Sequence, residues 1–515
     1  MEQHSDTFSA LWDATVSNHS NRNFLVFEDE DGTTSQWTYR EFDAVVERAS
    51  CALADHGVRA GTAIHLALRN CPAFLAVWLA AARLGAWFVP ADPASSARDI
   101  ANQVQRTRPA LGICAAARAQ TYRSGAPAGE FPIIELSETA ADLGNGPLTA
   151  AARNLASPPR ARVSPGDRLA VMFTSGTTSQ PKGVVLTQNN YVRVAQDMSS
   201  VIALRAEHRW LVTLPLFHAN AQYYCFAPAI AVGASVALTA KFSASQWVRQ
   251  AADLRATHAS LFAAPIRMIL ARTPARIPAL ALEHVWFAQS LGVEHHEEFT
   301  RLVGCRPRQL YGMTETVAAV TADVSEPLRH DVIGRPFNGR AVAVVDARTR
   351  TGTVIDGPGL LLVRGTRGVD LFSEYLDDPE VTAASFADDG CETWFATGDL
   401  VTIDREGVLR FVGRADDVVK VAGENVSLTE IESVLAQAPG VLEAAVLAEP
   451  DPIRDRVLIA YVVPRDPAAP PEAELLAEWA VSHLTPQARP RRWHVIDSLP
   501  RTSVGKVRRF KISAP

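Results

Sequence analysis

The stretch Thr174-Ser175-Gly176-Thr177-Thr178-Ser179-Gln180-Pro181-Lys182-Gly183 lies between two apolar runs, 168–173 and 184–186. Hydroxyl side chains and a glycine that directly follow a strand can present backbone N–H groups to phosphate oxygens, and a nearby lysine adds a positive charge. The stretch is not a Walker loop, because the Gly-x-x-x-x-Gly-Lys-Ser/Thr spacing is absent and no helix pattern follows directly. It predicts a loop that binds nucleotide phosphates, and the alternative is the polar tip of a hairpin.

Strand and helix patterns alternate on both sides of this loop, which is typical of an α/β fold. Thr38 and Glu41 have the spacing of a capping box, so we expect a helix to begin there and to end at Gly57. The apolar segment 73–83 predicts a buried helix, followed by a strand over 86–89. Further strands are predicted over 168–173, 210–214 and 341–345.

Residues 416–515 have a pattern of their own, in which a capping box at Ser427 begins a predicted helix. Two strands and an amphipathic helix are then predicted over 443–448, 457–463 and 472–484. We therefore predict a large N-terminal domain of α/β subdomains, residues 1–415, and a small mobile α+β C-terminal domain, residues 416–515. The hinge between them is predicted at Asp416.

The composition is that of a globular protein, with 515 residues, 47% hydrophobic and 21% charged. The net charge of −6 argues against nucleic acid as a partner, and no apolar stretch reaches the roughly 20 residues of a membrane span. The six cysteines form no Cys-x-x-Cys pair, which favours free thiols in a reducing cytoplasm over zinc. The segment 122–166, rich in Ala, Gly, Ser and Pro, predicts a surface connection, and the sequence carries no signal for oligomeric state.

Six further motifs follow one another between about residue 37 and residue 506. They are Leu214-Pro215-Leu216-Phe217-His218, Tyr311-Gly312-Met313-Thr314-Glu315-Thr316, Trp394-Phe395-Ala396-Thr397-Gly398-Asp399, Gly413-Arg414-Ala415-Asp416-Asp417, Gly423-Glu424-Asn425 and Pro500-Arg501-Thr502-Ser503-Val504-Gly505-Lys506. Together with the phosphate loop, they resemble the adenylate-forming superfamily of acyl-CoA synthetases, peptide-synthetase adenylation domains and luciferases. The resemblance implies an AMP-forming acid–CoA ligase with ATP, Mg²⁺ and coenzyme A as cofactors.

The resemblance assigns roles on the nucleotide side. The residues that would bind the phosphates are Thr174, Ser175, Gly176, Thr177, Thr178 and Lys182. In the next motif Thr314 would contact the α-phosphate and Glu315 would hold Mg²⁺, with Tyr311 and Gly312 in the same cofactor-binding set. Out of context, a Thr-Glu pair is more often the start of a helix.

Asp399 would accept hydrogen bonds from both ribose hydroxyls, and Arg414 would add a ribose or phosphate contact. Lys506 would reach the α-phosphate and the substrate carboxylate during adenylation; on composition alone it is a solvated cation in a basic tail. For the second half-reaction, the resemblance implies a swing about Asp416 that removes Lys506. The swing would bring in the loop of Gly423 and Glu424, where glycine allows close passage of a pantetheine arm.

His218 would line the acyl pocket near the reacting carboxylate, although a satisfied core histidine is the alternative. The small side chains of Ala219, Ala263, Ala264 and Ala288 suggest a roomy pocket. Trp286, Tyr223 and Tyr224 either close that pocket or belong to the core. Amino-acid activators commonly carry a carboxylate just after Phe217, so histidine there favours aryl, enoyl or aliphatic acids.

Two departures from the family pattern fall on the ATP side. Ser179 stands where the phosphate loop usually has another glycine. The segment 288–293, which the resemblance places at the adenine, lacks the usual paired glycines and proline. These changes leave open an enzyme that chiefly converts a supplied acyl-adenylate to a thioester. Other open alternatives are a stand-alone enzyme that loads a carrier protein, a luciferase-like oxygenase and an inactive nucleotide-binding scaffold.

Overall fold

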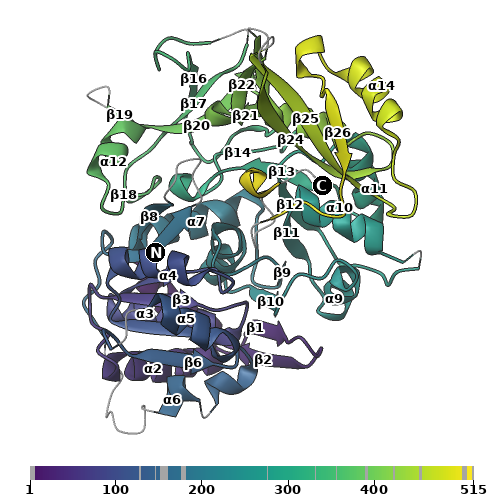
Figure 1. The fold of residues 1–515 in the computed structure, drawn as a ribbon. Coiled ribbons are helices and arrows are strands. Elements are labelled where there is room, and N and C mark those ends of the chain that lie inside the picture. The colour runs from purple at the N-terminus through teal and green to yellow at the C-terminus, as the bar shows by residue number, and fades with distance from the viewer. Residues whose placement is uncertain are drawn as a thin grey trace.

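The computed structural model describes residues 6–126, 129–144, 146–150, 160–174, 181–274, 276–330, 332–354, 357–388, 393–421, 424–451, 455–501 and 507–512. Its strands form two large mixed sheets, an antiparallel sheet, a hairpin and a small C-terminal sheet (Figure 1). This arrangement confirms the predicted α/β class. No helix in the described residues combines the length and apolar composition that a membrane span requires.

The first large sheet carries the ends of the predicted phosphate loop. Its order is β18 (Glu374–Tyr375), β8 (Lys182–Thr187), β7 (Arg168–Thr174), β4 (Trp87–Pro90), β3 (Ala63–Ala67), β5 (Leu111–Ala115) and β6 (Ile133–Leu136). The strands from β7 to β6 are parallel, whereas β8 and β18 run antiparallel at the other edge.

Strand β6 corrects the prediction for 122–166, because this strand, with η2 (Ala140–Leu143) and α6 (Pro147–Ala150), lies inside the supposed connection. Strand β6 has only four residues, of which Ile134 and Leu136 are buried. Four residues are too few for the alternation of buried and exposed side chains to be recognised in the sequence.

The second large sheet supplies most of the motif-bearing segments. Its order is β15 (Arg335–Pro336), β14 (Thr321–Ala322), β13 (Arg308–Tyr311), β12 (His284–Ala288), β11 (His258–Phe262), β9 (Arg209–Val212), β10 (Ser235–Thr239), β1 (Asn23–Glu28) and β2 (Thr34–Thr38). The strands from β13 to β1 are parallel. Because carboxyl ends of parallel strands meet at one edge, the segments after β9, β11, β12 and β13 lie at the same edge.

The helices of the large domain pack against both sheets. They are α1 (Phe8–His19), α2 (Tyr39–Asp55), α3 (Pro72–Leu84), α4 (Ala97–Thr107), α5 (Ala119–Gly125), α7 (Gln188–Val201), α8 (Ala227–Val232), α9 (Trp247–Asp253), α10 (Ala263–Arg272) and α11 (Val293–Val303). The Thr38 capping box and the buried helix α3 are as predicted, and Gly85 is the C-cap of α3. One core unites α2, α3, α7 and α8 with strands of both sheets.

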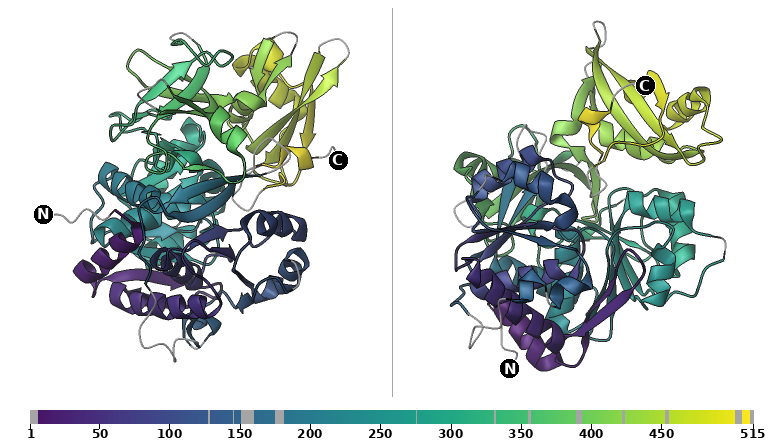
Figure 2. Two further views of the ribbon diagram at one scale, coloured as in Figure 1. Left: turned by 90° about the vertical axis from the view of Figure 1, so that its left-hand side faces the viewer. Right: turned by 60° about the horizontal axis from the view of Figure 1, so that its bottom comes forward.

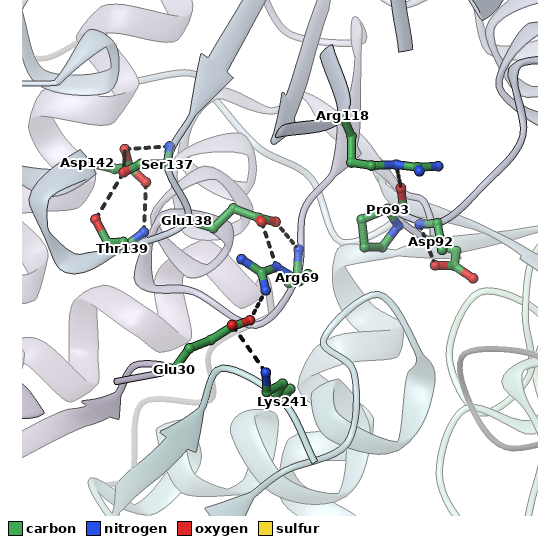
Figure 3. Close-up of polar contacts among 11 residues, drawn as sticks. Glu30, Arg69, Asp92, Pro93, Arg118, Ser137, Glu138, Thr139, Asp142 and Lys241 are labelled. Atoms are coloured by element: carbon green, nitrogen blue, oxygen red, sulfur yellow. Dashed lines mark hydrogen bonds and ion pairs between the residues drawn. The ribbon is translucent and has the colours of Figure 1, made fainter. Parts of the chain in front are cut away.

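Charged residues at the carboxyl ends of strands fasten the two sheets to each other (Figure 3). Arg69, which follows β3, donates from Nε to Glu138 at 2.7 Å and pairs with Glu30, which follows β1. Lys241, which follows β10, also pairs with Glu30 at 3.2 Å. This chain of ion pairs links the ends of three strands from different sheets to the segment after β6.

An antiparallel sheet follows, with the order β16 (Val342–Val345), β17 (Gly359–Arg364), β20 (Thr393–Ile403) and β19 (Phe386–Asp388), and with β21 (Leu409–Arg414) beside β20. Helix α12 (Pro379–Ser385) lies beside it, and the 3₁₀ turn η6 (Ala415–Asp417) leads out of β21. The predicted hinge residue Asp416 is in this turn.

The C-terminal segments gather at one end of the molecule (Figure 2). They comprise the hairpin β22 (Val418–Val421) and β23 (Glu424–Ser427), helices α13 (Leu428–Leu435) and α14 (Ala473–His483), and the sheet β24 (Val441–Asp451), β25 (Asp455–Pro464) and β26 (Arg492–Val495). They share a core of their own. A large α/β domain followed by a small α+β domain is therefore confirmed as the architecture.

Candidate active site

The two strands that flank the phosphate loop form an antiparallel pair, in which Thr174 of β7 faces Lys182 of β8. Of the predicted loop residues, Thr174 and Lys182 are described, whereas Ser175, Gly176, Thr177, Thr178 and Ser179 lie outside the described residues. The apolar strands on each side bury Val171 and Val185 against Trp87. The sheet thus fixes both ends of the loop.

Lys182, Tyr375 and Glu315 come together although they are far apart in the sequence. The Lys182 ammonium lies 4.9 Å from the centre of the Tyr375 ring, on the neighbouring strand β18. The Tyr375 hydroxyl donates to Glu315 Oε1 at 3.1 Å. Burial, followed by the Glu315 charge, raises the pKa of Tyr375, so the phenol stays a donor. The structure therefore brings the end of the phosphate loop close to the carboxylate predicted to hold Mg²⁺.

Glu315 lies in η5 (Thr314–Thr316), directly after β13 and Gly312. Thr314 and Glu315 are both buried. The backbone of η5 is held from outside the turn, because Phe372 N donates to Glu315 O at 2.9 Å and Arg340 donates to Thr316 O at 2.8 Å. These contacts from Phe372 and Arg340 hold the backbone of η5 in place.

Gly312 is needed because another chain segment approaches it closely. A Cβ at this position would lie 2.8 Å from the Tyr224 hydroxyl and 3.0 Å from Ala319 Cα. Tyr224 is buried, which agrees with its predicted place at the site or in the core. Any side chain at 312 would therefore push the Tyr311–Glu315 segment out of place.

Asp399 lies on β20 with two partners from different strands. Tyr311 donates its hydroxyl to Asp399 Oδ2 at 2.5 Å, and the Arg414 guanidinium lies 3.0 Å from Oδ1. Asp399 and Arg414 face each other across β20 and β21, so their pairing follows from strand register. Burial, then the Asp399 charge, raises the pKa of Tyr311 well above its ordinary value.

The segment before His218 is clamped by a buried amide. Asn70 accepts from Leu216 N at 2.8 Å and donates to Leu214 O at 3.1 Å. Gln222 adds a bond to Leu216 O at 2.7 Å while accepting from the Tyr191 hydroxyl. These bonds give the rigid entry to His218, whose half-buried ring lies 6.2 Å from that of Phe262 at the end of β11.

The small residues predicted around the acyl pocket lie in segments at the same edge of the sheet as the segment of His218. Ala219, Ala263 and Ala264 are buried and Ala288 is half-buried, and all four directly follow or end strands or turns at the sheet edge. Trp286 and Tyr223 are fully buried. The chain from Asn220 to Phe226 forms a π-helix, η4, a rare element that is frequent at functional sites.

The segment 288–293, predicted to meet the adenine, contains a strained residue. Gln289 has φ +75°, in the left-handed region of backbone conformation. Residues other than Gly, Asn and Asp are uncommon in this region. Gly292 has φ +84°, and a Cβ there would lie 2.9 Å from Gln437 Cγ of the small domain. Glutamine thus occupies a glycine-like conformation in the segment that lacks the family's glycines.

The junction with the small domain is held by Asp417 and Gly413. Arg509 pairs with Asp417 at 3.0 Å and with Glu432, and these carboxylates raise its pKa against the effect of burial. A Cβ at Gly413 would lie 2.5 Å from the Ser427 hydroxyl, which donates to Val412 O. Of the predicted small-domain residues, Glu424 begins β23, and Gly423 and Lys506 lie outside the described residues.

A second contact joins the small domain to α11. Arg465 donates to His295 Nε2 at 2.7 Å. Burial, then the charges of Arg267 and Arg465, lowers the pKa of His295 to about 4. The ring is therefore neutral at ordinary pH and can accept this bond.

The sequence did not reveal Tyr375, Asn70, Arg340 or Gln222 as residues that support the site. Each lies in a segment without a recognisable motif. Tyr375, Asn70 and Arg340 act on partners far along the chain, whereas Gln222 bonds to Leu216, six residues before it. Tyr375 and Glu315 are sixty residues apart, so no local sequence pattern indicates that they are in contact.

Comparison with known proteins gives a family for this site. Residues 12–376 match the family described as AMP-binding enzyme, and residues 430–506 match the AMP-binding enzyme C-terminal domain. The crotonobetaine/carnitine–CoA ligase of Salmonella arizonae is 29% identical, with 96% of this chain and 97% of that protein covered. That of Proteus mirabilis is 30% identical, with 88% of each chain covered.

Solved structures share the fold over nearly the whole chain. The benzoate CoA ligase from Burkholderia xenovorans LB400 aligns with a TM-score of 0.86 at 23% identity, covering 98% of this chain and 99% of that one. The anthranilate CoA ligase AuaEII, solved with anthranoyl-AMP, aligns with a TM-score of 0.86 at 22% identity, covering 98% and 96%. The chain belongs to the AMP-binding enzyme family, and within the adenylate-forming superfamily it is an AMP-forming acid–thiol ligase.

Proposed function

We propose that the chain is an ATP-dependent acid–CoA ligase that converts a hydrophobic carboxylic acid to an acyl-adenylate and then to an acyl-CoA thioester. One observation carries the proposal: the short segment from Tyr311 to Glu315 contacts both polar clusters of the site. Tyr311 donates to Asp399, and Glu315 accepts from Tyr375 beside Lys182. A nucleotide whose ribose lies at Asp399 and whose phosphates lie at Lys182 would span this segment.

In the first half-reaction, a carboxylate oxygen of the acid attacks the α-phosphorus of ATP, the new P–O bond forms, and pyrophosphate leaves. Phosphoryl-type transfer depends mainly on positioning and on neutralising charge. Thr174, Lys182 and the loop between them would hold the phosphates, with Thr314 at the α-phosphate. Lys506 would contact the α-phosphate and the attacking carboxylate.

The buried Glu315 carboxylate suits Mg²⁺, which prefers oxygen ligands and commonly takes one or two carboxylates together with substrate phosphates. Bound there, the ion would neutralise phosphate charge. Tyr375 would orient the carboxylate through its 3.1 Å bond. Asp399 would accept from the ribose hydroxyls while Tyr311 and Arg414 hold its orientation.

In the second half-reaction, the thiolate of coenzyme A attacks the acyl carbonyl, the C–S bond forms, and AMP leaves with the former carboxylate oxygen. We place the domain boundary at residues 415 and 416, so that residues 416–515 turn about Asp416. This motion would withdraw Lys506 and bring the backbone of Gly423 and Glu424 to the site.

An aryl, enoyl or aliphatic acid fits the acyl side best. His218 follows Phe217 where amino-acid activators commonly carry a carboxylate, so the site lacks a partner for a substrate ammonium at that position. The relatives named for crotonobetaine and carnitine, and those named for benzoate and anthranilate, all act on acids. Their variety supports the class of substrate rather than any one acid.

Two observations favour a second candidate, an enzyme that works mainly in the thioester half-reaction. Ser179 replaces a usual glycine of the phosphate loop, and Gln289 holds φ +75° in the adenine-facing segment. Both changes would act on ATP binding, and the thiol-side motifs keep the family pattern. Loading of a carrier protein uses the same pantetheine route and is the further alternative.

We also place the enzyme in a reducing cytoplasm. The five cysteines that the structure describes are free thiols, and four of them are buried. Burial raises the pKa of Cys305 to about 11, so this half-buried thiol also stays protonated and unreactive. A chain with these thiols is suited to a compartment that keeps them reduced.

The test is a panel of aryl, enoyl and aliphatic acids with purified enzyme, ATP and Mg²⁺. Pyrophosphate release and thioester formation are measured with free coenzyme A and, separately, with a phosphopantetheinylated carrier protein. Release with at least one acid and thioester formation on free coenzyme A are expected. Turnover only with the carrier protein would favour the loading enzyme, and turnover only from synthetic acyl-adenylate would favour the thioester-only enzyme.

A further inference from the structure

One face of the second large sheet is lined by alternate residues of three neighbouring strands. In-register pairing places His258, Ser260 and Phe262 of β11 beside His284, Trp286 and Ala288 of β12, with Trp210 and Val212 of β9 on the other side. The opposite face carries Leu211, Leu261 and Phe287, which belong to a separate core. The π-helix η4 packs against β9 and β11 on the first face.

Several polar atoms are buried between this face and η4 without a protein partner. Ser260, Trp286 and Trp210 are at most 3% exposed. Ser260 Oγ and the Nε1 atoms of Trp286 and Trp210 have no hydrogen-bond partner among the described residues. The same holds, within the described chain, for Asn220 Oδ1 and the Tyr223 hydroxyl of η4.

A buried donor without a partner destabilises a fold, and native proteins satisfy most such groups with protein, water or a ligand. A cluster of them in one layer therefore indicates a group that binds there. The indole Nε1–H can only donate and the serine hydroxyl can do either, so a group that meets Ser260 and Trp286 must accept hydrogen bonds, whereas Asn220 Oδ1 can only accept.

The bound group must also be uncharged. The residues of this face of β9, β11 and β12 include no Asp, Glu, Lys or Arg. The ionisable residues among them, His258 and His284, are kept neutral: burial lowers the pKa of His258 to about 3 and that of His284 well below its ordinary value. Arg308 of β13 is in register with Trp286, and its guanidinium is paired with Glu326 at 3.0 Å. Since Arg308 already has Glu326 as its partner, an ion in this layer would lack an unpaired countercharge.

The position of the cluster relative to the reacting carboxylate gives the reach of the substrate. Ser260 and Trp286 each lie two residues before the carboxyl end of their strand, where Phe262 and Ala288 border the segments of the site. Two residues of a strand span about 6.6 Å. This is about the length of one aromatic ring or of a short alkyl chain.

We propose that the acid carries a neutral hydrogen-bond acceptor, such as a hydroxyl, ketone or amide, at the end remote from its carboxylate, and that Ser260 and Trp286 donate to it. The proposal rests on the proposed function, since the carboxylate must be at the adenylation site. Ser260 and Trp286 are then specificity-determining residues. A plain hydrocarbon acid would fill the same space and leave both donors unsatisfied.

The test uses pairs of acids that differ only at the remote end. 4-Hydroxybenzoate is paired with 4-methylbenzoate, 4-hydroxycinnamate with 4-methylcinnamate, and 6-hydroxyhexanoate with heptanoate. kcat/KM is measured by pyrophosphate release for the wild type, Ser260→Ala and Trp286→Phe. Ser50→Ala is the matched control, because Ser50 is equally buried but lies in α2 and donates to Val46 O.

In at least one pair, the wild type should prefer the hydroxy acid by about 10- to 100-fold. Ser260→Ala should remove most of that preference by lowering kcat/KM for the hydroxy acid, while the methyl acid stays within about threefold. Ser50→Ala should leave the preference unchanged, and Trp286→Phe should reduce it independently of Ser260.

Equal or better use of the hydrocarbon acid in every pair would overturn the proposal. So would an equal loss for both members of a pair in Ser260→Ala, or a quaternary-ammonium acid that outperforms all neutral ones. These results still include pyrophosphate release and so leave the proposed function standing. No release with any acid, in the wild type, would reject the proposed function itself.

Discussion

The proposed nucleotide side and acyl side of the site meet on the second large sheet, through β13 on one side and β11 and β12 on the other, but their buried polar groups differ in how they are partnered. On the nucleotide side, Asp399 has Tyr311 and Arg414, and Glu315 has Tyr375. On the acyl side, Ser260 and Trp286 have no partner among the described residues. The nucleotide side binds ATP in every turnover, so the protein itself can hold its polar groups in place. On the acyl side, the hydrogen bonds of Ser260 and Trp286 would be supplied by the bound acid.

The comparison predicts that changes on the nucleotide side affect all acids alike. Replacing Lys506 with Ala should have the largest effect, lowering pyrophosphate release by about 100- to 1,000-fold with every acid, because a cation at the α-phosphate is lost. Thioester formation from synthetic acyl-adenylate should stay within about threefold. Lys511→Ala, an exposed lysine near the same end of the chain, is the control. Equal loss in both half-reactions would contradict the separate role of Lys506.

Glu315→Gln should lower pyrophosphate release by about 100-fold at fixed Mg²⁺, because an amide is a weaker ligand than a carboxylate. Raising the Mg²⁺ concentration should recover part of the activity. Glu374→Gln serves as the control, since this exposed carboxylate is next to Tyr375 but pairs with Arg168. A Glu315→Gln variant with unchanged dependence on Mg²⁺ would remove Glu315 from the metal site.

Tyr311→Phe should raise the KM for ATP by about tenfold, because Asp399 loses the 2.5 Å bond that orients it. The ratio of kcat/KM between any two acids should not change. A changed preference among acids would show that the two sides are coupled. Tyr461→Phe, a buried tyrosine that stacks on His494 in the small domain, controls for loss of a hydroxyl.

A smaller effect is expected from pH at the contact between His295 and Arg465. Burial, Arg267 and Arg465 lower the pKa of the docked ring to about 4, and undocking removes the contribution of Arg465, so a proton binds the undocked state more tightly. The contact is strongest above about pH 6.5 and weakens as pH falls toward 4. Two fluorophores, one on each domain, would report this change.

Arg465 and Arg267 both face the ring, so protonation would add a third positive charge there. His295→Gln keeps a neutral acceptor and should make the distance between the domains independent of pH over this range. The same pH dependence in His295→Gln would assign the change to another group.

The smallest effect concerns the strained residue between the two sides. Gln289→Val should lower the free energy of unfolding by about 1–2 kcal/mol, because a β-branched side chain fits φ +75° poorly. Gln289→Gly should change it by less than about 0.5 kcal/mol, since relief of strain and the added freedom of the unfolded chain nearly cancel. Thermal unfolding measures both. A harmless Gln289→Val would mean that the residue does not hold this conformation.

The sequence predicted the elements whose signals are local. The Thr38 capping box, the apolar α3 and the order of motifs sufficed for the fold class, and the motifs supplied the candidate site residues. The sequence did not predict β6, because four residues are too few to show an alternating pattern. It also did not predict the roles of Tyr375 and Asn70, because their partners lie far along the chain. Unpartnered atoms such as Trp286 Nε1 become visible only when the layers on both sides of the strand are known.

The central claim is that a carboxylate oxygen of the acid becomes bonded to the α-phosphorus of ATP. It is tested most directly by supplying an accepted acid labelled with ¹⁸O in its carboxylate, together with ATP, Mg²⁺ and coenzyme A, and by following the label with mass spectrometry. We predict that one labelled oxygen appears in AMP and that the thioester keeps the other. Label in inorganic phosphate or pyrophosphate, or AMP without label, would contradict the account.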